Sequence, residues 1–367
     1  MEYVLSELCE QVVTARAAQR PLVLRGGGTR LFYGGPLPAA DRFSWLDLAA
    51  YRGVVSYEPS ELVLTARAGT PLAEIETVLD EQGQMLAFEP PRFGAAGTLG
   101  GCVASGLAGP RRMAVGGLAD FVLGTRLLNA DGSVLRFGGE VMKNVAGYDL
   151  SRLLAGSLGV LGALVEVSVK VLPRPRCEAT QVFELDETAA LDHCLMWRSR
   201  PLPISATWWQ PEPTGAVGRL TVRLSGNETA VRQARLAMGG DALPAPSAEP
   251  FWLAVRDQTH PFFQQRPLWR VVLPPDAPSL GLGPVVHEWG GSLRWLAGAP
   301  EAPEADALRG RVQALGGSAT LYRHDGVPPG FSVFHPLPEG ILQIHRRLKH
   351  EFDPAGIFNP LRLYPEF

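Results

Sequence analysis

The feature that most constrains this sequence is a glycine-dense run over residues 90–162. It holds 16 glycines in 73 positions, whereas glycine makes up about 7% of an average protein. Glycine loses more conformational freedom on folding than any other residue. A chain that accepts this cost needs a backbone that adopts positive φ or approaches another group closely. The run therefore predicts glycine loops that line a binding surface.

Length and composition predict an ordinary globular protein with two domains. The 367 residues exceed what one hydrophobic core usually holds. Apolar residues make up 46% of the chain, charged residues make up 19%, and the net charge is −3. The chain has no long basic run, which argues against a nucleic-acid footprint and against a polybasic membrane patch.

The cysteines and the apolar stretches predict a cytoplasmic protein without a transmembrane segment. None of the four cysteines forms a C-x-x-C pair, which argues against an iron–sulfur cluster, a structural zinc or a disulfide scaffold in this chain. Residues 1–20 indicate an amphipathic helix rather than a signal peptide, because acids precede the apolar residues. The most apolar stretch, 153–172, carries Glu166 and Lys170, so we expect a buried turn and strand there rather than a membrane span.

A short apolar strand near 21–25 leads directly into the first glycine loop. Consecutive backbone N–H groups in such a turn can form an anion-binding concavity, and flanking arginines add positive charge. The loop matches neither G-x-G-x-x-G nor G-x-x-x-x-G-K-[ST], which argues against Rossmann and P-loop sites. A simple tight turn explains it equally well at this point. The loop residues are Arg25, Gly26, Gly27, Gly28, Thr29 and Arg30.

A second glycine loop opens the glycine-dense run. Pro90 and Pro91 fix an extended entry, and a helix is expected to begin near Thr98 or Leu99. Small residues on this helix permit close backbone approach, and its N-terminus favours an anion. The residues of this block expected to contact a ligand are Pro91, Gly97, Thr98, Gly100, Gly101, Ala104 and Ser105.

Hydrophobic periodicity and turn residues predict an α+β chain. In the first half we expect a helix over 72–83 with Thr70 as its N-cap, a hairpin over 121–137 that turns at Asp131-Gly132, and a strand over 163–172. From about residue 177 the pattern is that of helices on a mostly antiparallel sheet. There we expect strands at 180–185, 204–210, 219–224, 269–273, 292–296 and 319–322, helices at 187–198, 228–238 and 303–315, and loops at 240–250, 274–284 and 298–303.

Four ordered blocks together resemble one known pattern. They are RGGGT at 25–29, P…GTLGG…A at 91–104, G-S-x-G-x-L-G at 156–162 and FDPxGIxNP at 352–360. This order resembles the FAD-binding domain of flavin oxidoreductases in the vanillyl-alcohol-oxidase or PCMH-type family. The block KNVAGYD at 143–149 narrows the resemblance to the short FAD-binding (E) subunits of bacterial glycolate oxidases, also called glycolate dehydrogenases.

The resemblance implies a fold and a set of partners. The fold is a PCMH-type FAD-binding domain of two α/β subdomains at 1–175, an α+β cap with a mostly antiparallel sheet at 176–335, and a C-terminal segment at 336–367 that returns to the flavin domain. The implied partners are a larger catalytic FAD subunit and an iron–sulfur subunit, through which a cytoplasmic chain would reach the inner membrane.

The resemblance also implies how FAD is held. Relatives with a covalent flavin use a histidine in or near the first glycine loop, whereas here that loop ends in Thr29 and Arg30, so we expect non-covalent FAD. Further cofactor contacts implied by the resemblance are Asn144, Gly162, Val165 and Asn359.

The substrate side departs from the family pattern. Catalytic relatives carry G-D-G-N-L-H and a second histidine pair that hold a divalent metal, whereas the nearest stretch here is YRHDG at 322–326. None of the seven histidines has metal-binding spacing, so no metal site is expected. A surface or capping role explains each histidine most simply, and among them His324, together with Arg323, is the candidate for holding a carboxylate and taking a proton. Arg111 and Arg112 are most simply interpreted as solvated charge.

Three functional hypotheses remain open at this point. The leading one is a FAD-binding subunit of a complex that oxidises glycolate or a similar 2-hydroxy acid. The second is a stand-alone FAD-dependent dehydrogenase for a D-lactate-like acid. The third is a catalytically degenerate flavoprotein fold that serves as a scaffold subunit.

Overall fold

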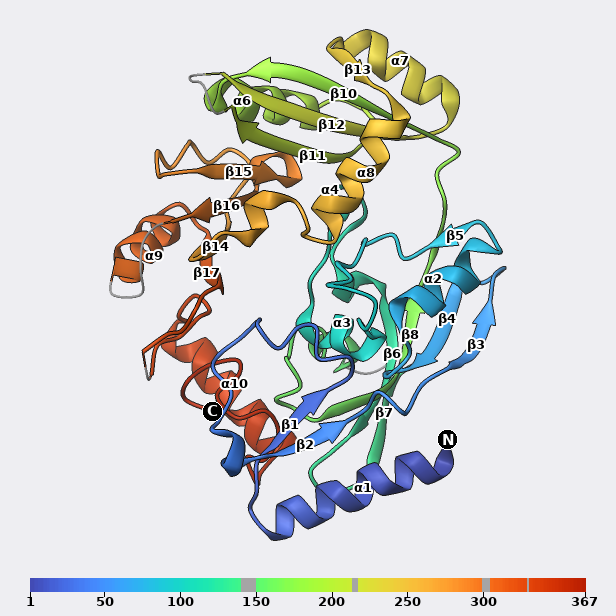
Figure 1. Ribbon diagram of the computed structural model, residues 1–367, viewed down its shortest axis with the longest axis vertical. Coiled ribbons are helices and arrows are strands. Elements are labelled where there is room, and N and C mark those ends of the chain that lie inside the picture. The colour runs from blue at the N-terminus through green and yellow to red at the C-terminus, as the bar shows by residue number, and fades with distance from the viewer. Residues whose placement is uncertain (140–149, 213–216, 299–303, 329) are drawn as a thin grey trace. The chain divides into compact units, whose positions relative to one another are not determined.

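The chain forms two compact units (Figure 1). The computed structural model describes residues 1–139, 150–212, 217–298, 304–328 and 330–367. Unit 1 comprises Met1–Leu107, Gly117–Pro173 and Pro336–Phe367, and unit 2 comprises Ala108–Gly116 and Arg174–His335. The functional roles expected for 1–175, 176–335 and 336–367 stay predictions.

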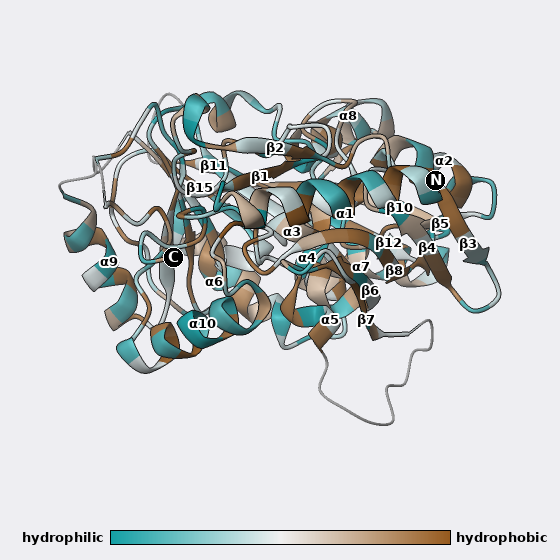
Figure 2. Ribbon diagram, turned by 90° about the horizontal axis from the view of Figure 1, so that it is seen from below, coloured by the Kyte–Doolittle hydropathy of each residue, from teal (hydrophilic) through white to brown (hydrophobic). Residues whose placement is uncertain are grey.

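Unit 1 contains a small parallel sheet that joins distant parts of the chain. Strand β1 (Leu22–Arg25) pairs with β2 (Ser44–Asp47), and Leu22 forms a second parallel bridge with Phe358 of the tail. Helix α1 (Glu2–Ala17) buries one apolar stripe, and α10 (Glu339–Phe352) precedes the tail. Figure 2 shows that both helices carry hydrophilic as well as hydrophobic residues, as expected for helices with one buried face.

The larger sheet of unit 1 is antiparallel and has the strand order β3-β4-β8-β6-β7. Its central strand β8 is buried at six of eight positions, so most side chains on both of its faces are covered. The strands are β3 (Val54–Glu58), β4 (Val63–Arg67), β6 (Val122–Leu128), β7 (Val134–Gly138) and β8 (Ala163–Lys170). The remaining elements of unit 1 are η1 (Ala40–Arg42), α2 (Leu72–Asp80), β5 (Gln84–Met85), α3 (Leu99–Ser105), η2 (Leu118–Phe121), α5 (Leu150–Leu153) and β9 (Leu172–Pro173).

A buried ion pair fixes the tail on unit 1. The Lys349 ammonium lies 2.7 Å from the Asp353 carboxylate and donates to the backbone oxygens of Val160 and Phe358, each at 2.8 Å. Asp353 is 1% exposed, and it also accepts from the N–H groups of Ile357 and Phe358. The turn after α10 is therefore held by a fully partnered carboxylate, as buried charges require.

Unit 2 is built on an eight-stranded sheet in which every neighbouring pair is antiparallel. Its core combines Trp209 and Trp269 of the sheet with the apolar faces of the helices. In chain order the elements are α4 (Arg112–Val115), β10 (Cys177–Leu185), α6 (Glu187–Arg198), β11 (Ile204–Pro211), β12 (Gly218–Gly226), α7 (Glu228–Met238), β13 (Asp241–Leu243), α8 (Ala245–Arg256), η3 (Pro261–Gln264), β14 (Leu268–Val272), β15 (Val285–Glu288), η4 (Trp289–Gly291), β16 (Leu293–Ala297), α9 (Ala305–Ala314) and β17 (Ser318–Arg323). The expected α+β fold with a mostly antiparallel cap sheet is confirmed.

Three local expectations were wrong. The predicted loop 240–250 contains β13 and the start of α8, because its prolines occupy the early part of a helix whose apolar face packs inward. Pro71 rather than Thr70 is the N-cap of α2; the Thr70 hydroxyl instead donates to the Arg67 carbonyl at 2.7 Å. Arg111 is not solvated, since it is 5% exposed and lies 2.6 Å from the Glu178 carboxylate.

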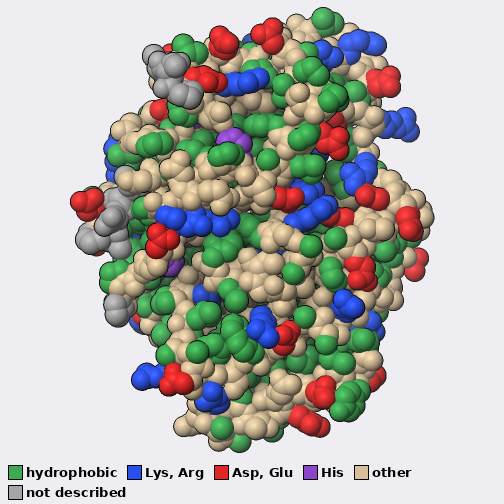
Figure 3. Space-filling view, viewed as in Figure 1, with side chains coloured by type: hydrophobic (Ala, Val, Ile, Leu, Met, Phe, Trp, Pro, Cys, Tyr) green, Lys and Arg blue, Asp and Glu red, His purple; other side chains and the backbone are tan. Residues whose placement is uncertain are grey.

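Acidic and basic side chains are interspersed over the face of the molecule in Figure 3. None of the helices in the described ranges combines the length and the hydropathy needed to cross a bilayer.

We predict that Asp353→Asn lowers the free energy of unfolding by about 3–5 kcal/mol, because it leaves the Lys349 ammonium buried without a counter-charge. Urea unfolding followed by circular dichroism measures the change. The control is Glu339→Gln, which removes an exposed ion pair to Arg346 and should change the stability by less than about 1 kcal/mol. Equal stability changes in the two variants would contradict the assignment.

Candidate cofactor-binding site

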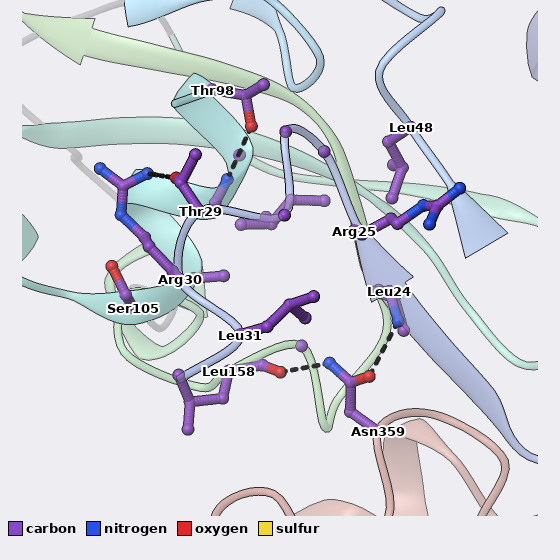
Figure 4. Close-up of a pocket in the computed structure, with 18 of the residues that line it drawn as sticks. Leu24, Arg25, Thr29, Arg30, Leu31, Leu48, Thr98, Ser105, Leu158 and Asn359 are labelled. Atoms are coloured by element: carbon purple, nitrogen blue, oxygen red, sulfur yellow. Dashed lines mark hydrogen bonds between the residues drawn. The ribbon is translucent and has the colours of Figure 1, made fainter. Parts of the chain in front are cut away.

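Unit 1 contains a cavity of about 100 Å³ where its glycine loops meet (Figure 4). The predicted contacts that line it are Arg25, Gly26, Gly27, Gly28, Thr29, Arg30, Thr98, Gly100, Gly101, Ala104, Ser105 and Asn359. The structure thus brings together residues from three distant parts of the sequence.

The first glycine loop follows β1 and has room for no side chain at its centre. A Cβ on Gly27 would lie 1.6 Å from the Ala96 carbonyl oxygen, and Gly28 has a φ of +69°. Within the described ranges, the backbone N–H groups of residues 26–29 donate to no protein acceptor. A run of such donors along a cavity wall suits an anion, and this is the observation by which the site fits a cofactor pyrophosphate.

The second glycine loop leaves room for a ligand but offers it no backbone N–H donors at the start of α3. Thr98 caps α3 by accepting from the Gly101 N–H at 3.4 Å. The N–H groups of Leu99 and Gly100 donate to the carbonyls of Thr70 and Ala68. Because all three N–H groups have protein acceptors, the expectation that this helix N-terminus offers them to an anion was wrong.

The Asn359 side chain joins the tail to two other segments by hydrogen bonds. Its Oδ1 accepts from the Leu24 N–H at 2.9 Å, and its Nδ2 donates to the Leu158 carbonyl at 2.6 Å (Figure 4). Both Asn359 and Leu158 have positive φ, +41° and +51°. The Asn359 amide therefore shapes the cavity through these protein contacts.

The charged residues of the first loop are already engaged with the protein. The Arg25 guanidinium lies 2.8 Å from Asp47 and stacks over Trp45. The Arg30 guanidinium donates to the Pro91 carbonyl at 2.5 Å and to the Thr29 hydroxyl at 3.4 Å. Pro91 thus contributes by holding Arg30, whereas it does not appear in the cavity lining.

Three other predicted contacts do not line the cavity. Gly97 packs against the Arg92 carbonyl, and Gly162 packs against Leu127 and Leu128. Val165 is fully buried in β8, where its carbonyl accepts from the Ala68 N–H at 2.9 Å. Asn144 lies outside the described residues. For these residues a role in cofactor binding stays a prediction.

The candidate catalytic residues Arg323 and His324 lie in unit 2, whereas the cavity is built from unit 1. The Arg323 guanidinium donates to the Gln258 side-chain oxygen at 3.4 Å, and burial lowers the pKa of Arg323. His324 is half-buried. Their proposed contact with a substrate carboxylate stays a prediction.

Sequence reasoning missed one charged residue of the cavity wall, Arg362. It is 6% exposed and follows the Asn-Pro turn of the tail. In the sequence, Arg362 could have been noticed only as a single arginine just after the tail segment that was expected to return to the flavin domain.

Comparisons with known proteins agree with this site. A family model described as an FAD binding domain matches residues 5–138. Glycolate oxidase subunit GlcE of Escherichia coli (strain K12) is 44% identical over 361 residues, which are 98% of this chain and 97% of that protein. Glycolate oxidase subunit GlcD of Bacillus subtilis (strain 168) is 31% identical over 160 residues, which are 44% of this chain and 33% of that protein. A solved structure of alkyldihydroxyacetonephosphate synthase superposes with a TM-score of 0.65 over 96% of this chain and 74% of that chain at 18% identity, which is a similarity of fold.

The fold, the glycine loops and the family match define a PCMH-type flavoprotein whose cofactor is FAD. Within that class of FAD-dependent oxidoreductases, the chain belongs to the family of glycolate oxidase subunit GlcE.

We predict that Gly27→Ala weakens FAD binding at least tenfold while the protein stays folded, because the new Cβ collides with the Ala96 carbonyl and displaces the loop. Titration by flavin fluorescence measures the affinity, and circular dichroism checks the fold. Gly340→Ala is the matched control, since a Cβ there meets nothing within 4 Å. Unchanged affinity in Gly27→Ala would show that this loop does not hold the cofactor.

Proposed function

We propose that this chain is the FAD-binding subunit of a glycolate oxidase complex, also called glycolate dehydrogenase. The single observation that carries the proposal is the 44% identity that extends over 98% of the chain. The cavity with four backbone N–H groups along one wall supports it independently. The complex would oxidise glycolate to glyoxylate, or a similar 2-hydroxy acid to the corresponding 2-oxo acid, with release of two electrons and two protons.

The chain's own residues would bind and orient the cofactor. Residues 26–29 would donate backbone hydrogen bonds to the pyrophosphate. The second loop would admit the cofactor because the residues that it contributes to the cavity wall, Thr98, Gly100 and Gly101, are small. When bound, FAD supplies the acceptance and onward transfer of two electrons. Among the described residues that line the cavity, none is a histidine or a cysteine, which supports non-covalent binding.

The partners that we propose are a larger catalytic FAD subunit and an iron–sulfur subunit. The subunit names of the two bacterial relatives support a multi-chain enzyme. Oxidation of the substrate is assigned to the larger subunit, because this chain lacks the metal-holding histidine motif of the catalytic relatives. We place the complex in the cytoplasm, with contact to the inner membrane through the partners.

Cofactor analysis of the tagged chain, purified alone and with co-expressed partner subunits, tests this proposal. The isolated chain should be yellow and release FAD on acid treatment, and anaerobic glycolate should leave its flavin oxidised. A colourless chain that does not take up added FAD would refute the proposal. Bleaching of the isolated chain by glycolate or D-lactate would favour the stand-alone dehydrogenase.

The scaffold hypothesis predicts a different result for Gly27→Ala. In a pure scaffold, the complex that contains this variant would assemble and turn over normally. We expect assembly without turnover, because the flavin site of this chain is needed. Co-purification of the partners measures assembly, and dye reduction by glycolate measures turnover.

A further inference from the structure

A buried cation in the cavity wall has backbone partners but no carboxylate partner. The Arg362 guanidinium donates through Nη2 to the carbonyls of Leu31 and Tyr33, at 2.8 and 2.7 Å, and through Nη1 to the carbonyl of Gly35. An arginine has five N–H donors. Nε and the second Nη1 hydrogen donate to no acceptor in the part of the chain that the structure describes.

The charge of Arg362 is offset by no acidic side chain within the described ranges. Burial lowers its pKa to about 10, which shows that the surroundings disfavour the cation. Carbonyl dipoles alone compensate a buried charge poorly, and such a charge is normally paired with one of opposite sign. Arg362 lines the same cavity as the donor run of residues 26–29.

Other buried cations in this protein show what a structural role looks like. Arg294 is fully buried and also donates to three carbonyls, those of Gly291, Ala277 and Pro278. The Glu187 carboxylate lies near enough to raise its pKa. Lys349 likewise has Asp353 as its counter-charge. Arg362 differs from both, because no acidic side chain offsets its charge within the described ranges. An anion that offsets this charge would have to enter the cavity.

We propose that Arg362 supplies the positive charge that neutralises the pyrophosphate of FAD, while it holds residues 31–35 in place. The proposal rests on the proposed function, since it requires that the cavity bind FAD. It deepens that function by assigning the charge of the site to the tail rather than to Arg25, which is paired with Asp47. An anion in the cavity satisfies both the guanidinium and the backbone donors of residues 26–29.

The test compares the affinity of Arg362→Gln, Arg362→Lys and the wild-type chain for FAD, ADP and riboflavin. ADP carries the pyrophosphate without the flavin ring, and riboflavin carries the ring without the pyrophosphate. We expect Arg362→Gln to lose at least tenfold affinity for FAD and ADP and less than twofold for riboflavin. Arg362→Lys keeps the charge and should stay within about threefold of wild type. Raising the NaCl concentration should weaken FAD binding less in Arg362→Gln than in wild type.

Arg294→Gln is the matched control, because it removes a buried guanidinium with the same kind of partners in unit 2. It should lower the melting temperature and leave FAD affinity unchanged. Wild-type FAD affinity in Arg362→Gln would overturn the proposal. An equal loss in Arg362→Gln and Arg362→Lys, or a loss for riboflavin as large as that for FAD, would also overturn it and leave only the holding role. A wild-type chain that binds no FAD would refute the proposed function itself.

Discussion

The binding cavity depends on the pairing of strand β1 with a tail segment that follows it by 335 positions in the sequence. The N–H and carbonyl of Leu22 bond to Ile357 and Asn359, and the Asn359 side chain bonds to the Leu24 N–H. The buried pair of Lys349 and Asp353 fixes the turn that presents this segment. The glycine loop begins where β1 ends, so the position of the loop follows from these contacts.

The second constraint is the close approach of two backbone segments. Gly27 touches the Ala96 carbonyl, and Gly26 leaves room for the Thr98 side chain and no more. These contacts explain why the first loop has consecutive glycines: each removes a side chain from a shared surface. The first loop keeps N–H groups available, whereas the second uses its own to pair with residues 68–70. The two glycine-rich segments therefore have different tasks, donation in one and space in the other.

Local signals predicted much of the fold. The helices Glu187–Arg198 and Glu228–Met238 begin and end at the predicted residues, because Asp186 and Asn227 cap them by accepting from the backbone. Helix α3 begins at Leu99, within the expected range, because Thr98 caps it in the same way. Helix α8 was missed because three prolines near its start dominate the local pattern. Strand β15 was not predicted, because it is only four residues long and its place in the sheet is set by its neighbours.

The candidate site was predictable where it depends on sequence motifs and unpredictable where it depends on long-range contacts. The first loop and Asn359 lie at the cavity as the family pattern implied. The burial of Arg111 against Glu178 and of Arg362 against residues 31–35 depends on segments far apart in the chain. A sequence read locally shows only an arginine in each place, and an arginine is usually exposed.

The interleaving of the two units constrains the order in which this protein matures. Residues 174–335 of unit 2 lie between the strand that starts the cavity and the tail that completes it. During synthesis, the whole of that insertion leaves the ribosome before residues 357–359 can pair with β1. Domains generally fold as they emerge, so unit 2 has the opportunity to fold while unit 1 is still incomplete. Flavin loading must then be a late event, and a nascent chain that stalls within unit 2 carries both glycine loops without a finished pocket.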